Sequence, residues 1–127
     1  MSSTVKNDSK QLTATQEFFL LGKKQLAYYD KIRETRELTA KEKFEEDKIK
    51  DNLFLSVQKY ATHLINNYVK RYRIDSDARE EIMGEIKDKF FAKLDSYIPS
   101  KTTPVTFFNK DFFEEIRTYI NERSQHL

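Results

Sequence analysis

Apolar side chains recur every three or four residues over most of this chain, which contains two glycines and two prolines among 127 residues. The longest stripe passes through Ile49, Leu53, Val57, Tyr60, Leu64, Tyr68 and Tyr72. This spacing places its members on one face of an α-helix. Few glycines and prolines favour long helices joined by few turns. Because no segment alternates apolar and polar residues for long, the sequence predicts an all-α fold without a sheet.

Four principal helices in a single compact domain are predicted, at residues 13–37, 39–72, 77–97 and about 105–123. Thr13 with Gln16 and Thr39 with Glu42 have the spacing of capping boxes, and Asp77 is the expected cap of the third helix. Pro104 suits the first turn of the fourth helix, after a loop at 99–104. A break in the second helix near residues 66–67 remains an alternative.

The remaining inward positions follow from the same periodicity. They are Phe18, Leu21, Gly22, Leu26, Tyr29 and Ile32 in the first helix, Phe44 in the second, Ile82, Ile86, Phe90, Leu94 and Tyr97 in the third, and Phe108, Phe112, Ile116, Tyr119 and Ile120 in the fourth. Gly22 and Gly84 are isolated helix glycines, which suit close approach by another backbone.

The composition excludes several classes of protein. There is no cysteine, and neither His63 nor His126 has ligand partners at helical spacing, so no metal site is expected. No catalytic set of side chains or phosphate-binding loop is present, so we expect neither an enzyme nor a cofactor. The polar N-terminus and the lack of about 18 consecutive apolar residues predict a cytoplasmic protein with no membrane contact. Residues 1–12 are expected to be a flexible segment preceding a domain at 13–127.

Charge is unevenly distributed around residue 75. Residues 59–74 carry four basic side chains and no acidic one, whereas residues 75–88 carry six acidic side chains against two basic ones. Asp77, Glu81, Glu85 and Asp88 are spaced by four, four and three residues and so form one acidic ridge on a helix. The ridge fits a basic partner surface; a solvated helix face near the positive end of the helix dipole is the alternative.

The last predicted helix combines aromatic and basic side chains. Phe107, Phe108, Phe112 and Phe113 cannot all face inward, so one or two are expected to be partly exposed. Aromatic rings interleaved with cations stack on unpaired bases of nucleic acids. A wide apolar face in a small helical bundle explains the same pattern without a ligand.

Three stretches taken together resemble region two of bacterial RNA polymerase sigma factors. "DNLFLSVQKYA" at 51–61 resembles the opening of that region, "EIMGEIKDKFFAKLDSY" at 81–97 its polymerase-binding helix, and "VTFFNKDFFEEIRTYI" at 105–120 the segment leading into its promoter-reading helix. "LTATQEFFLLGKK" and "ELTAKEKFEEDKIKDN" resemble the helices that precede region two. The resemblance covers most of the chain after residue 12.

The resemblance implies a transcription initiation factor domain that acts by binding. Its expected partners are the clamp of core RNA polymerase and promoter DNA at the minus-ten element. The polymerase-binding residues it implies are Asp77, Glu81, Gly84, Glu85 and Asp88. The DNA-binding residues expected from the resemblance and the pattern are Lys101, Phe107, Phe108, Lys110 and Arg117.

The chain also departs from the family. It has no tryptophan in the melting segment, Glu114 and Glu115 stand where the family prefers Arg and Gln, and Gly84 replaces a Gln. The family's helix-turn-helix domain has no counterpart here, so a second chain supplying it is a further expected partner. The alternatives are a fragment of a longer factor, a polymerase-binding regulator that does not read promoters, and a helical scaffold or assembly protein.

Overall fold

The computed structural model describes residues 11–72 and 75–124, and within them every regular element is helical. The elements are α1 (Ala14–Arg33), α2 (Ala40–Tyr72), α3 (Ser76–Lys93), the short 3-10 helix η2 (Leu94–Ser96) and α4 (Pro104–Ser124). The predicted all-α fold of four principal helices is confirmed. The first ten residues of the predicted flexible segment lie outside the described part of the chain.

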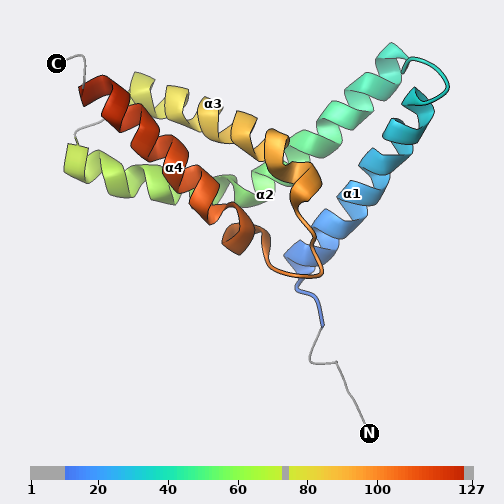
Figure 1. Ribbon diagram of the computed structural model, residues 1–127, viewed down its shortest axis with the longest axis horizontal. Coiled ribbons are helices and arrows are strands. Elements are labelled where there is room, and N and C mark those ends of the chain that lie inside the picture. The colour runs from blue at the N-terminus through green and yellow to red at the C-terminus, as the bar shows by residue number, and fades with distance from the viewer. Residues whose placement is uncertain (1–10, 73–74, 125–127) are drawn as a thin grey trace, which may run out of the picture.

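The helices form a V around α2, which belongs to both arms (Figure 1). The first half of α2 packs antiparallel to α1, and its second half packs with α3 and α4. α2 is continuous from Ala40 to Tyr72, so the alternative of a break near residues 66–67 is not observed.

Side-chain caps set the starts of the helices. Both predicted capping boxes form: Thr13 with Gln16, and Thr39 with Glu42. The predicted cap of α3 is wrong by two residues, because Asp75 accepts the Ala78 backbone N–H at 2.8 Å. The Ala78 side chain, in the first turn of the helix, is buried.

The core lies where the two arms of the V meet. Phe90 of α3 is fully buried, and its ring centroid lies 6.1 Å from that of Phe19 in α1, 5.2 Å from Phe54 in α2 and 4.7 Å from Phe108 in α4. The stripes predicted for the third and fourth helices are confirmed as core or as partly buried residues packed on it. One apolar cluster thus connects all four helices.

The predicted inward face of α1 is partly wrong. Phe18 and Leu21 are 43% and 57% exposed, whereas Phe19 is fully buried. Phe44, predicted inward on α2, is 68% exposed. The inward carboxylate there is Glu46, which is buried with its charge paired to Arg33 at 2.7 Å.

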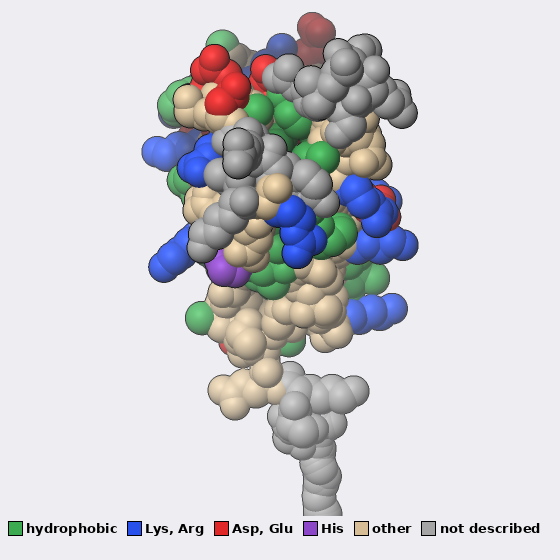
Figure 2. Space-filling view, turned by 90° about the vertical axis from the view of Figure 1, so that its left-hand side faces the viewer, with side chains coloured by type: hydrophobic (Ala, Val, Ile, Leu, Met, Phe, Trp, Pro, Cys, Tyr) green, Lys and Arg blue, Asp and Glu red, His purple; other side chains and the backbone are tan. Residues whose placement is uncertain are grey.

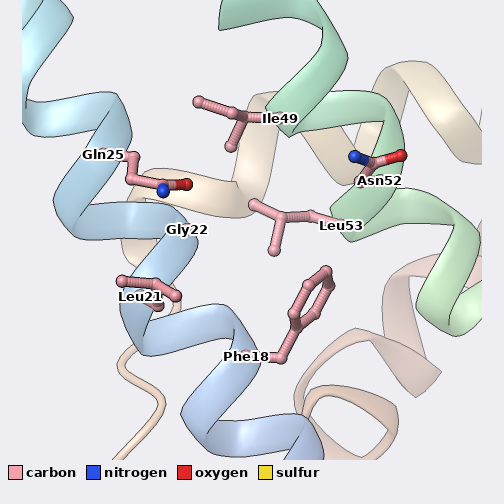
Figure 3. A pocket seen from close by; sticks show the side chains of 7 residues that line it. All are labelled: Phe18, Leu21, Gly22, Gln25, Ile49, Asn52 and Leu53. Atoms are coloured by element: carbon pink, nitrogen blue, oxygen red, sulfur yellow. The ribbon is translucent and has the colours of Figure 1, made fainter.

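Of the two helix glycines, Gly22 is the one that another helix approaches. A Cβ at Gly22 would lie 2.8 Å from Cδ2 of Leu53, a side chain that projects from α2 toward α1 in Figure 3. At Gly84 a Cβ would have no neighbour within 4 Å. The sequence suggested that another backbone approaches Gly84 closely. Among the described residues, no other part of this chain does so.

Candidate functional site

α3 separates its apolar and acidic residues onto different faces. Ala78, Ile82, Ile86 and Phe90 are buried, which turns the intervening positions outward. The four carboxylates of the predicted acidic ridge are all exposed, and so is Gly84. The acidic ridge consists of Asp77, Glu81, Glu85 and Asp88.

Two of the three lysines of α3, Lys87 and Lys89, are directed to neighbouring helices and not to the acidic ridge. Lys87 pairs with Asp51 of α2 at 3.3 Å and lies over the rings of Phe54 and Phe91, 5.8 and 5.7 Å from their centroids. Lys89 points to Glu115 of α4 at 3.6 Å. Both lysines are thus engaged with neighbouring helices.

The contacts of the acidic ridge with α4 involve Glu81. Glu81 accepts a hydrogen bond from the Tyr119 hydroxyl at 3.0 Å. Within residues 11–72 and 75–124, no lysine or arginine forms an ion pair with Asp77, Glu85 or Asp88. The negative charge of Asp77, Glu85 and Asp88 is therefore left to solvent or to a partner.

The second predicted group of residues is only partly accessible. Lys101, Lys110 and Arg117 are exposed, and Phe107 is half-buried against Tyr97, with ring centroids 5.1 Å apart. Phe108 is fully buried. The prediction that Phe108 contacts DNA is wrong, because its ring lies on the inward stripe of α4 and has no face left for a base.

α4 carries different charges toward its two neighbours. On its α3 side, Glu115 pairs with Lys89 and Tyr119 bonds to Glu81. On its α2 side, Phe113 packs on Tyr68 with ring centroids 5.4 Å apart. The Arg117 guanidinium lies over the Phe113 ring, 5.8 Å from its centroid. Glu115 is thus directed toward α3, whereas Arg117 lies on the α2 side.

The exposed cations around α4 continue onto α2 and form with them a basic side of the molecule. The residues of α2 were not among the predicted site residues. Lys59, His63 and Arg71 are exposed, and Tyr60 of the same helix donates a hydrogen bond to Asn109 of α4. Figure 2 looks onto the free end of the arm formed by α2, α3 and α4. Lys and Arg side chains lie around the middle of this view, and most Asp and Glu side chains in view lie near the top. The lack of any acidic residue between positions 52 and 72 was the available signal.

The chain matches no protein-family model, no curated protein and no solved structure. Among the described residues, no helix combines the length and apolar character needed to cross a membrane. No group of three or more potential metal-ligating side chains occurs among them either.

Proposed function

We propose that this chain is a sigma-like transcription initiation factor domain that binds core RNA polymerase and contacts minus-ten promoter DNA. The observation that carries the proposal is the exposed acidic ridge of α3, whose neighbouring lysines are directed to other helices. Both partners place the protein in the cytoplasm. A second chain with a helix-turn-helix domain is part of the same proposal.

The physical argument for docking through the acidic ridge is electrostatic. Like charges three or four residues apart on a helix repel by a few tenths of a kcal/mol per pair, so a basic partner surface relieves a cost already present in the fold. Charge complementarity also speeds encounter and weakens as salt increases. A basic coiled coil, which the resemblance implies on the polymerase clamp, is a partner of this kind.

The exposed cations around α4 support the DNA part of the proposal. Lys110 and Arg117 are two helical turns apart and both exposed, and Lys101 is exposed in the segment before α4. Such side chains contact phosphates, which position a strand without reading its sequence. Phe107, half-buried, is the aromatic residue left to meet an unpaired base after Phe108 is excluded. The mechanism is binding, without covalent chemistry.

Retention of the purified chain on immobilised core RNA polymerase tests the docking surface. We expect the wild-type chain to be retained and Glu85→Lys to lose about tenfold or more in affinity, since a desolvated charge pair becomes a repulsion. Asp47→Lys is the matched control, because Asp47 is an exposed carboxylate of α2 and gives the same charge change. No retention of the wild-type chain, or equal loss in both variants, would disprove docking through the acidic ridge.

Fluorescence anisotropy with a single-stranded minus-ten oligonucleotide tests the DNA contact. Lys110→Ala and Arg117→Ala are each expected to weaken binding and to reduce the slope of log affinity against log salt by about 0.7. Phe107→Ala is expected to cost about 1–3 kcal/mol if a base stacks on its ring. Binding unaffected by all three substitutions would count against promoter contact by this chain.

A polymerase-docking regulator that does not read promoters is the second candidate. The burial of Phe108 and the half-burial of Phe107 favour it, since they leave little aromatic surface for flipped bases. The absence of tryptophan has the same effect. Retention on polymerase combined with no oligonucleotide binding would support this candidate over the first.

A further inference from the structure

The segment that joins α3 to α4 is held by α1, a helix distant from it in sequence. This connector comprises residues 94–103 and begins with η2. Lys23 Nζ of α1 donates hydrogen bonds to three of its backbone carbonyl oxygens, at 2.6 Å to Leu94, 3.2 Å to Asp95 and 2.7 Å to Tyr97. An ammonium group has three N–H donors, so these carbonyls use all of them.

The position of Lys23 fits the electrostatics of a helix end. The last carbonyls of a helix have no partner within it and carry a partial negative charge, which a cation stabilises. The side chain is half-buried, and this burial lowers the pKa of the Lys23 amine, while the nearby Asp95 carboxylate acts in the opposite direction. Folding therefore places a partly desolvated cation at the point where the chain leaves α3.

Two further contacts tie the connector to α1 and to itself. Gln16 Nε2 donates a buried hydrogen bond to the Pro99 carbonyl at 2.8 Å. The Phe19 ring packs edge-on against Tyr97, with centroids 5.4 Å apart. The Tyr97 hydroxyl donates a hydrogen bond to the Thr102 carbonyl at 2.7 Å. Tyr97, which is itself bound by α1, thus links the two ends of the connector.

The connector leads directly to residues proposed to contact DNA. Lys101 lies within it, and its backbone N–H bonds to the Ile98 carbonyl at 3.0 Å. Phe107, in the first turns of α4, packs on Tyr97. A change in the backbone at Tyr97 therefore reaches both residues through direct contacts.

We propose that Lys23 is a positioning residue: by gathering the carbonyls of Leu94, Asp95 and Tyr97, it fixes the connector and thereby the placement of Lys101 and Phe107. The effect on the connector stands by itself, whereas the effect on nucleic-acid binding rests on the proposed function. The acidic ridge, which lies on α3 before the connector, is not controlled by Lys23.

Amide hydrogen exchange of the full chain tests the first part. In Lys23→Met, we expect the Tyr97 and Lys101 amides to exchange about tenfold faster or more, because the connector opens locally once its charged hydrogen bonds are lost. Lys23→Arg is a milder variant that keeps the charge and is expected to give an intermediate loss. Equal protection of these amides in all three proteins would overturn the proposal.

Arg33→Met is the matched control, because Arg33 lies on the same helix and pairs with Glu46 of α2, away from the connector. It is expected to lower the stability of the α1–α2 arm without changing exchange at Tyr97 and Lys101 relative to other amides of the core. If Lys23→Met and Arg33→Met raised exchange alike at every amide, Lys23 would be an ordinary stabilising residue and the proposal would fail.

Binding measurements separate this proposal from the proposed function. Lys23→Met is expected to weaken binding to the minus-ten oligonucleotide while retention on polymerase is unchanged, and Arg33→Met to change neither. If the connector amides exchange faster in Lys23→Met but the wild-type chain binds no oligonucleotide, the role of Lys23 in fixing the connector is supported. The same result would disprove promoter contact by this chain. Loss of polymerase retention in Lys23→Met would overturn the separation of the connector from the acidic ridge.

Discussion

The two glycines within helices differ in what surrounds them, and this difference gives a paired test. Gly22 faces Leu53, a buried side chain, and both residues line a small pocket between α1 and α2 (Figure 3). We expect Gly22→Ala to destabilise the protein by about 1–3 kcal/mol, because a Cβ 2.8 Å from Leu53 Cδ2 forces that side chain to shift, and this cost outweighs the gain in helix propensity. Urea denaturation followed by circular dichroism measures this change.

Gly84→Ala is the control for that experiment. Its added methyl group meets nothing within 4 Å, so the higher helix propensity of alanine is expected to stabilise the protein by up to about 1 kcal/mol. If Gly22→Ala also stabilised the protein, the close packing of α1 on α2 at Leu53 would be contradicted.

Adjacent phenylalanines mark where sequence reasoning is least secure for single residues. Periodicity allowed Phe18 to face inward, but the structure buries Phe19, in line with Gly22, Leu26 and Tyr29. Which of the two phenylalanines is buried depends on the position of α2, and the spacing of apolar residues within α1 does not give that position. At the second pair, Phe108 was correctly placed in the core by its spacing from Phe112, and the same burial excludes it from the site.

The hairpin between α1 and α2 is reinforced by charged groups near its turn. Arg36 binds Glu42 with two hydrogen bonds of 2.8 and 3.0 Å, and the same carboxylate accepts the Thr39 backbone N–H. These contacts, first of all the hydrogen bonds from Arg36, lower the pKa of Glu42 from 4.5 to about 2. Hydrogen bonds from Arg33 likewise lower the pKa of the buried Glu46.

Stability is therefore expected to fall in acid partly through Glu42. Its pKa is lower in the folded than in the unfolded chain, so its contribution is fully present above about pH 4.5 and is lost as the pH falls toward 2. Thermal unfolding of wild type and Glu42→Gln across this range measures the effect. We expect the difference between the two melting temperatures to shrink as the pH falls; a constant difference would show that the Glu42 charge contributes nothing.

The start of a helix was predictable where both residues of a capping box lie close together in the sequence. The boxes at Thr13 and Thr39 each need only a residue three positions later, and both formed. For α3 the predicted cap was Asp77, whereas the cap in the structure is Asp75, two residues earlier. Local signals thus predicted all four principal helices and missed the start of α3 by two residues.

Contacts between distant segments account for what the sequence could not provide. The exposure of the acidic ridge followed from its spacing, since Ile82 and Ile86 fix the opposite face. The hydrogen bonds from Lys23 to the connector join residues more than 70 positions apart in the sequence. No sequence feature near Lys23 distinguishes it from Lys24. The basic side of the molecule likewise emerges only when α2 and α4 are placed next to each other.

The stability of the whole molecule is expected to depend on Phe90, whose ring meets aromatic rings from α1, α2 and α4. Phe90→Ala is expected to cost about 3–5 kcal/mol, a large part of the total stability of a small domain. Phe44→Ala makes the same chemical change on a largely exposed ring and is expected to stay within about 0.5 kcal/mol of wild type. Urea unfolding followed by near- and far-ultraviolet circular dichroism gives both values. A loss below about 1 kcal/mol for Phe90→Ala, or separate transitions in the wild type, would mean that the two arms of the V do not share one core.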